Sequence, residues 1–345
     1  MPEREQIIDA FLARHGWGAA NRVPLADDAS FRRYDRVTDK DRHAVLMDAP
    51  PPHEDVRPFI TIARQLSRLG YSAPAILAED TATGLLLLED LGDNTYTRVL
   101  ATTPETEHEL YALAVDVLID LHRRPSAETV SAELPPYDEA RLVDEALLLT
   151  DWFMPAMLGT PTDGACRDAY VAAWQQVLKP VLAASPTLVL RDFHVDNLIW
   201  LPDRAGVAGC GVLDFQDALA GHPVYDLMSL LEDARRDISD DLRHAMLNRY
   251  LHAFPNLAKT GEIQDNFHQA FAILAAQRHA KVIGIFTRLC VRDAKADYLV
   301  HIPRVWKLLE RALTDPALAP VAAWMETYLP ASLRGIPAIG PKVED

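Results

Sequence analysis

The most informative stretches of the sequence are residues 187–200, TLVLRDFHVDNLIW, and residues 209–217, GCGVLDFQD. In each stretch a short apolar run ends at an acidic residue. The first run leads to Asp192, with Asn197 five positions later, and the second leads to Asp214. Short apolar runs bounded by polar segments are typical of buried strands. We therefore expect two strands, separated by a short polar segment, that bring these three side chains together.

The chemistry of these three side chains suits phosphoryl transfer from ATP. Such a transfer needs little covalent chemistry, so a protein has mainly to hold the acceptor hydroxyl in line and to gather Mg²⁺ around the phosphates. Asp192 is the expected base or orienting group for the hydroxyl. Asn197 and Asp214 are the expected ligands of Mg²⁺, which prefers oxygen atoms. Single Asp and Asn residues often form turns, so the prediction depends on the matched spacing of all three.

The two stretches resemble the protein-kinase pattern H-R-D-L-x-x-x-N followed by D-F-G, with Leu190 in place of the His and Gln216 in place of the Gly. With residues 221–227, GHPVYDL, they resemble the aminoglycoside-phosphotransferase family of small-molecule kinases. The resemblance implies an α+β, bilobal protein-kinase-like fold with a small antiparallel-sheet N-lobe and a larger, mainly helical C-lobe. It also implies that Arg191 and Asp226 are structural, with Asp226 capping a helix and bracing the catalytic loop.

The order of elements before this motif agrees with a kinase N-lobe. Apolar spacing predicts helices at residues 7–12 and 56–69, a hairpin of strands at 31–37 and 44–47, and a strand at 85–88. Further helices are predicted at residues 110–121, 142–153, 170–182 and 267–289. We expect residues 1–88 to form the N-lobe, 89–93 the hinge and 94–345 the C-lobe.

The nucleotide is expected at the hinge. Backbone groups of Glu89 and Leu91 could pair with the adenine edge, although this segment could also be an ordinary exit from a strand. Protein kinases carry a strand Lys for the phosphates, but residues 44–49 read AVLMDA and contain none. Ser30 and Arg32 are the expected replacements. Arg33 would face the opposite side of the strand, and a surface ion pair is the alternative role for either Arg.

Three other polar residues near the motif are candidates. His194 stands where protein kinases carry a Lys that faces the transferred phosphate, so it is either a catalytic hydrogen-bond donor or a loop residue exposed to solvent. Gln216 and Asp217 follow the predicted metal ligand directly. They would either bind sugar hydroxyls or brace the loop.

Four stretches, DASFRRY, LMDAPPPHEDVRPF, LRDFHVDNLIWL and QRHAKVIGIFTRL, resemble one branch of the family, the bacterial N-acetylmuramate/N-acetylglucosamine anomeric kinases. The resemblance implies ATP-dependent phosphorylation of the anomeric hydroxyl to give sugar 1-phosphates for peptidoglycan recycling. Arg278 and Arg288 are then candidates for binding the lactyl carboxylate, or else ordinary helix-surface residues. The alternatives are a kinase for an aminoglycoside, choline, homoserine or another sugar, and a nucleotide-binding regulatory module without turnover.

Composition sets the remaining expectations. The 34 Lys and Arg residues against 50 Asp and Glu residues give a net charge of −16, which argues against nucleic acid or an anionic membrane as the main partner. The start of the chain lacks the apolar core of a signal peptide, and the three cysteines form no C-x-x-C pair. We expect a cytoplasmic monomer that acts on a small-molecule amino sugar.

Overall fold

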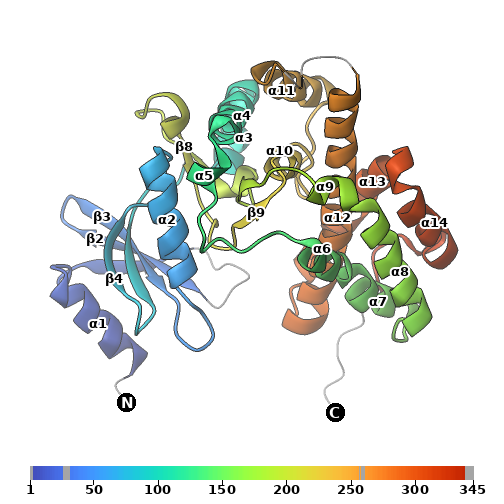
Figure 1. Ribbon diagram of the computed structural model, residues 1–345. Coiled ribbons are helices and arrows are strands. Elements are labelled where there is room, and N and C mark those ends of the chain that lie inside the picture. Colours follow the sequence, from blue (N-terminus) through green and yellow to red (C-terminus); the bar gives the residue numbers. More distant parts are fainter. Residues whose placement is uncertain (1–2, 26–31, 256, 258–260, 339–345) are drawn as a thin grey trace, which may run out of the picture. The chain divides into compact units, whose positions relative to one another are not determined.

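The computed structural model describes residues 3–25, 32–255, 257 and 261–338. The chain divides into two compact units (Figure 1). The first takes its residues from Met1–Val117 and Asp192–Ala218, and the second from Leu118–Arg191 and Leu219–Asp345. The segment with Asp192, Asn197 and Asp214 thus belongs to the same unit as the N-terminal sheet. The lobe bounds expected from the sequence stay a prediction.

An antiparallel sheet of five strands, in the order β1-β2-β3-β5-β4, forms the centre of the first unit. Its strands are β1 (Asn21–Pro24), β2 (Arg33–Asp39), β3 (Arg42–Asp48), β4 (Ile76–Asp80) and β5 (Leu85–Glu89). The hairpin β2–β3 and strand β5 confirm the predicted elements. In the register, Arg36 lies opposite Val45 and Tyr34 lies opposite Met47. Because side chains alternate along a strand, these four share one face of the sheet.

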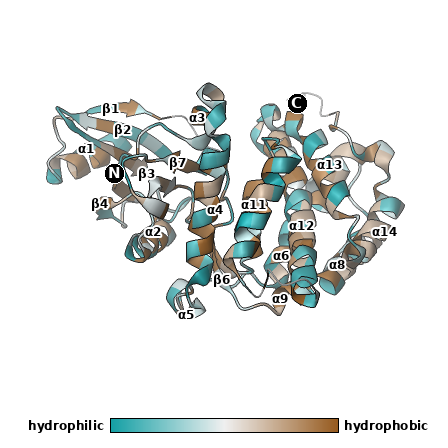
Figure 2. Ribbon diagram, turned by 90° about the horizontal axis from the view of Figure 1, so that it is seen from above, coloured by the Kyte–Doolittle hydropathy of each residue, from teal (hydrophilic) through white to brown (hydrophobic). Residues whose placement is uncertain are grey.

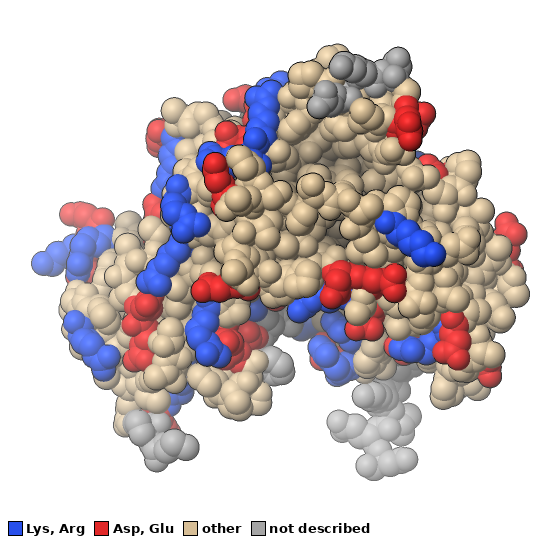
Figure 3. Space-filling view, in the orientation of Figure 1, with Lys and Arg blue, Asp and Glu red and all other residues tan. Residues whose placement is uncertain are grey.

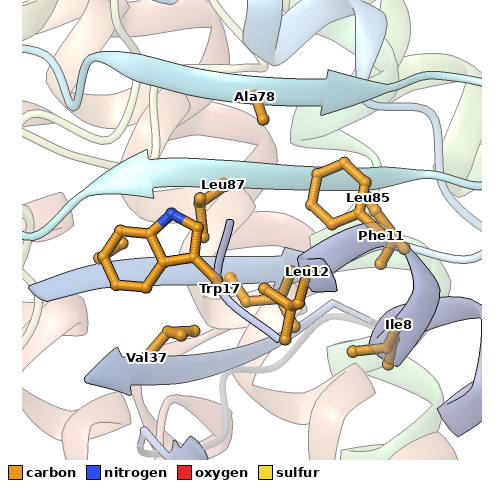
Figure 4. Packing of buried hydrophobic residues seen from close by; sticks show 10 residues of the cluster. Ile8, Phe11, Leu12, Trp17, Val37, Ala78, Leu85 and Leu87 are labelled. Atoms are coloured by element: carbon orange, nitrogen blue, oxygen red, sulfur yellow. The ribbon is translucent and has the colours of Figure 1, made fainter. Parts of the chain in front are cut away.

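The opposite face of the sheet packs against α1 (Arg4–Arg14), the predicted N-terminal helix. Phe11 and Leu12 from the helix, with Trp17 just after it, meet Val37 and Leu87 from the strands in one buried cluster (Figure 4). All of them are less than a tenth exposed. Burial of this apolar surface fixes which face of each strand points toward α1, and it leaves the other face for the site.

Helix α2 (Arg57–Leu69) is the second predicted helix of this unit. It buries Phe59, Ile60, Ala63 and Leu66, which recur at helical intervals. The helix ends at Gly70, whose φ of 92° lies in the left-handed region that glycine adopts without strain. Phe59 packs on Phe215 with ring centroids 4.8 Å apart. This contact connects α2 to the segment that follows Asp214.

The motif itself forms two small antiparallel pairs. In the first unit, β7 (Leu198–Trp200) pairs with β8 (Cys210–Val212). In the second unit, β6 (Thr187–Val189) pairs with β9 (Leu219–Gly221). A 3₁₀ turn, η3 (Val195–Asn197), leads into β7. The expected strands are present, and the pairing of β7 with β8 brings the two ends of the motif together.

The rest of the described chain is mainly helical, which with the five-stranded sheet confirms the predicted α+β class. The predicted helix at 142–153 is interrupted: α6 ends at Ala146 and a π-helix, η2, follows. The longer helices are α4 (Glu107–Arg123), α6 (Glu139–Ala146), α8 (Gly164–Val177), α10 (Val224–Leu231), α11 (Asp240–Ala253), α12 (Glu262–Asp293), α13 (Ile302–Ala312) and α14 (Ala319–Tyr328). The shorter ones are α3 (Tyr96–Thr102), α5 (Ser126–Thr129), η2 (Leu149–Phe153), α7 (Met154–Leu158) and α9 (Lys179–Leu182).

Surface and core follow the hydropathy of each element. Helix α13, for example, carries both hydrophobic and hydrophilic residues (Figure 2), and its buried residues are Ile302, Val305, Trp306, Leu309 and Ala312. On the face drawn in Figure 3, acidic and basic side chains are interspersed. Within the residues that the structure describes, no helix has the length and apolar character needed to cross a membrane.

Candidate active site

A cavity of about 450 Å³ lies within the first unit. Its walls come from one face of β2 and β3, from the end of β5 and the residues that follow it, and from the flanks of the β7–β8 hairpin. The lining residues are Leu25, Tyr34, Arg36, Val45, Phe59, Pro74, Leu88, Glu89, Asp90, Leu91, Gly92, Asp93, Thr95, Arg98, Asp196, Asn197, Ile199, Leu213 and Asp214. The predicted hinge and both predicted metal ligands therefore line one cavity.

The β7–β8 hairpin brings Asn197 and Asp214 together. The Leu213 N–H donates to the Asn197 carbonyl at 2.9 Å, which extends the hairpin by one step. The Asn197 Nδ2 donates to the Asp192 carbonyl at 3.0 Å and lies 3.4 Å from Asp214 Oδ2. These bonds fix the amide plane, so the Asn197 Oδ1 is the amide atom suited to a hard cation. Asp192, Asn197 and Asp214 thus form one constellation.

This constellation offers oxygen atoms from one carboxylate and one amide at the cavity wall. Among the described residues, no group of three or more His, Cys, Asp or Glu side chains is arranged to hold a metal ion. A set of two protein oxygens suits Mg²⁺, because that ion keeps several waters and takes further ligands from substrate phosphates. The donor set therefore fits Mg²⁺ bound with a nucleotide.

Two residues of the motif have unusual backbone conformations. Asp214 has a φ of 56° and Arg191 a φ of 70°, in the left-handed region that residues other than glycine rarely adopt. Such conformations cost about 1–3 kcal/mol each and persist where the surroundings hold them. At Asp214 the Gln216 Nε2 donates to Oδ1 at 2.7 Å, which holds the carboxylate in place.

The residues around the constellation separate into two groups. His194 is buried, with 7% of its surface exposed, so the alternative of a solvent-exposed loop residue is wrong. Its Nε2 lies 3.4 Å from the Asn197 Nδ2. Gln216 is also buried and braces Asp214, which was one of its two expected roles. Asp217 is exposed.

Asp226 holds the chain just before Asp192, within the second unit. Its carboxylate accepts from the Leu190 N–H at 2.7 Å and from the Arg191 N–H at 2.9 Å, and it is completely buried. The expected bracing of the loop thus has a clear geometry. The expected helix cap is wrong, because Pro223 occupies the N-cap of α10 and no side chain caps that helix. A buried carboxylate is stabilised by the two N–H donors it accepts from.

The Arg191 side chain ends in a second buried network of the second unit. It pairs with the Glu145 carboxylate, which also lies 3.0 Å from the Lys281 ammonium. Burial opposes ionisation of Glu145, but Lys281 and Arg191 outweigh it and hold the pKa of Glu145 below its usual value. Glu145 is therefore ionised, and it anchors Arg191 next to the position of Asp192 in the chain. Neither Glu145 nor Lys281 was predicted from the sequence.

The predicted hinge segment, residues 89–93, begins at the last residue of β5. The Glu89 N–H donates to the carbonyl of Ala75, the residue just before β4, at 2.8 Å, so this donor already has a partner. The Glu89 side chain pairs with Arg204 at 2.5 Å. Recognition of an adenine edge by this segment would therefore use the Glu89 carbonyl and the Leu91 backbone, not the Glu89 N–H.

Arg36, which was not predicted from the sequence, forms the main ion-pair network on this side of the cavity. Its guanidinium binds Asp90 at 2.7 and 3.1 Å and Asp93 at 2.8 and 3.1 Å. Asp93 and then Asp90 raise the pKa of Arg36, and Arg36 lowers that of Asp93. Since 54 and 57 residues separate Arg36 from its partners, no local pattern reveals this link.

The remaining predicted residues lie elsewhere. Ser30 is outside the described residues. Arg32 is not part of the cavity lining and pairs with Glu54 at 2.9 Å. Arg278 and Arg288 lie on α12 in the second unit, the first buried and the second half-buried. Burial, and then Arg292, lower the pKa of Arg288.

The fold and the cavity define a kinase-like phosphotransferase. Residues 22–263 match the model of the phosphotransferase enzyme family, so the chain belongs to that family. The predicted family and enzyme class are confirmed. The chain is 35% identical to an N-acetylmuramate/N-acetylglucosamine kinase of Caulobacter vibrioides, over 96% of this chain and 98% of that protein. It is 39% identical to a protein of the same name from Pseudomonas aeruginosa, over 91% of each chain.

Solved structures agree on the fold. The choline kinase LicA of Streptococcus pneumoniae is similar with a TM-score of 0.61 and 12% sequence identity, covering 92% of this chain and 99% of that one. The GDP complex of aminoglycoside 2'-phosphotransferase-IIIa has a TM-score of 0.59 and 13% identity, covering 91% and 99%. At such low identity these structures confirm the kinase-like fold and do not indicate the acceptor.

Proposed function

We propose that the protein transfers the γ-phosphoryl group of ATP to the anomeric hydroxyl of N-acetylmuramate and N-acetylglucosamine, giving sugar 1-phosphates. The observation that carries the reaction type is the single cavity lined by the hinge, Asn197 and Asp214. The names of the relatives at 35% and 39% identity support the choice of acceptor. Because ATP is the donor, we also propose that the protein works in the cytoplasm.

Each residue of the constellation has a distinct task in this proposal. Asp192 orients the sugar O1 hydroxyl and accepts its proton. Asn197 and Asp214 supply the oxygen ligands of Mg²⁺, which neutralises charge on the phosphates when it is bound. Gln216 and Asp226 keep the Asp214 carboxylate and the Arg191 backbone in place. His194, buried against Asn197, is a candidate hydrogen-bond donor to the transferred group.

The test is ADP release with ATP and Mg²⁺ in the presence of N-acetylmuramate, N-acetylglucosamine, N-acetylgalactosamine, choline, homoserine or kanamycin. We expect release with the first two sugars and a 1-phosphate product by mass spectrometry. Release with another acceptor alone would replace the proposed substrate but keep the enzyme class. ATP binding without turnover on any acceptor would favour the regulatory module.

A further inference from the structure

The face of β3 that lines the cavity lacks the cation that protein kinases place there. Val45 lines the cavity, and Met47 is the next residue on the same face. Met47 therefore stands where the kinase pattern has its phosphate-binding Lys. It is 1% exposed, and a buried thioether supplies no charge. The positively charged side chain that binds the phosphates of a nucleoside triphosphate in this cavity must therefore come from another element.

Two arginines flank Tyr34 along the chain at two-residue spacing, Arg36 within β2 and Arg32 just before it. Arg36 is on the hinge side and is already bound by two carboxylates, Asp90 and Asp93. Arg32 comes two residues before Tyr34, directly ahead of β2. At about 3.3 Å per residue, Arg32 and Arg36 lie roughly 13 Å apart along an extended chain. Arg32 is therefore at the end away from the hinge, beyond the position of an adenine held there.

Arg32 is held in a partly buried ion pair. Its Nε lies 2.9 Å from Glu54 Oε2, and the two side chains are only 14% and 13% exposed. Glu54 lies three residues before α2, and α2 contacts the segment after Asp214 through Phe59 and Phe215. The ion pair thus connects the start of β2 to the segment that leads into α2, the helix that packs near the predicted metal ligands. In protein kinases a Lys–Glu ion pair joins strand β3 to a helix, whereas here the pair joins the residue before β2 to the segment before α2.

We propose that Arg32, positioned by Glu54, binds the phosphates of the nucleotide in place of the absent strand lysine. The proposal rests on the proposed use of ATP and adds Glu54 as a positioning residue. A guanidinium can donate two parallel hydrogen bonds to a phosphate while a third N–H stays on the carboxylate, which a lysine ammonium does less well. Met47 can then remain apolar and support Tyr34, its neighbour across the strands.

The first test compares the binding of Mg²⁺-ATP and of adenosine by calorimetry in Arg32→Met. Loss of charged hydrogen bonds to phosphate should weaken ATP binding about 10- to 100-fold. Adenosine has no phosphates, so its affinity should not change. Arg33→Met is the matched control, because Arg33 is the exposed neighbour and should leave both affinities unchanged. An unchanged ratio of ATP to adenosine affinity in Arg32→Met would overturn the proposal.

Glu54→Gln tests the positioning role without a change of shape. We expect the KM for ATP to rise about three- to tenfold, as for loss of a partly buried ion pair, with the KM for the sugar unchanged. If both KM values rise together, Glu54 acts on the fold and not on Arg32. The binding assay needs no acceptor, so an error in the sugar assignment leaves this test intact. A wild-type protein that binds no ATP would contradict the proposed function itself.

Discussion

At the scale of single residues, Asp192 is the group whose loss should affect chemistry most. We predict that Asp192→Asn keeps ATP binding and lowers turnover about 10²- to 10⁴-fold, the usual contribution of a positioned base. The amide cannot accept the proton of the sugar hydroxyl. Turnover is measured by ADP release and binding by calorimetry. Asp203→Asn is the control, since Asp203 is an exposed acid in the turn between β7 and β8. Near-normal turnover in Asp192→Asn would refute the role of Asp192.

Asp226 gives a second prediction at this scale, for stability. Each of its two oxygens accepts from one backbone N–H, at 2.7 and 2.9 Å. Asparagine keeps only one acceptor oxygen, so one buried N–H in Asp226→Asn would lose its partner. We predict a loss of about 1–3 kcal/mol in the free energy of unfolding, measured by urea denaturation. Unchanged stability would show that the loop is held by other contacts.

At the scale of elements, local patterns predicted most of the first unit. The hairpin β2–β3, strand β5 and helices α1 and α2 have clear apolar periodicity, and all were expected. Strands β1 and β4 were not. β1 has four residues with none fully buried, and β4 contains an irregularity between Ile76 and Ala78, so neither shows a clean alternation. Their place in the sheet comes from pairing with β2 and β5.

The residues of the candidate site that lie within one sequence motif were predictable. Those whose role depends on partners far away in the sequence were not. Asp192, Asn197 and Asp214 stand within one motif, and in the structure the Asn197 amide contacts the Asp192 backbone carbonyl and the Asp214 carboxylate. Arg36 and Glu145 depend on partners far away in the sequence, so no spacing rule reaches them. Burial was also not predictable, because no local pattern in the sequence indicates that His194 is enclosed.

Leu148 lies where the predicted helix at 142–153 is interrupted, and it packs closely against Gly284 of α12. A Cβ added to Gly284 would lie 2.3 Å from the Leu148 carbonyl carbon and oxygen, so only glycine fits this contact. We predict that Gly284→Ala lowers the free energy of unfolding by about 1–3 kcal/mol through overpacking. Gly164→Ala is the control, because nothing lies within 4 Å of a Cβ there. In α8 an alanine should be neutral or stabilising by up to about 1 kcal/mol. Equal effects of the two changes would exclude a packing cause.

At the scale of the whole molecule, two partly buried histidines should make stability depend on pH. Burial lowers the pKa of His222 to about 4, and burial followed by His222 lowers the pKa of His122 to about 3. Both are neutral in the folded protein near pH 6, whereas the unfolded chain takes up protons below about 6.5. The contribution of these two histidines to the free energy of unfolding is therefore fully present above pH 6.5. It falls as the pH drops toward 4, by at most about 1.4 kcal/mol per pH unit for each histidine.

A substitution separates this effect from general acid unfolding. In His222→Asn the amide oxygen can still accept the Val224 N–H that His222 Nδ1 accepts at 3.1 Å, but nothing titrates. We predict that the slope of unfolding free energy between pH 6.5 and 4 becomes shallower, by at most about 1.4 kcal/mol per pH unit. His108→Asn, at an exposed site, should keep the wild-type slope. Since the asparagine cannot take up a proton, a His222→Asn variant that keeps the wild-type slope would show that the acid sensitivity comes from other groups.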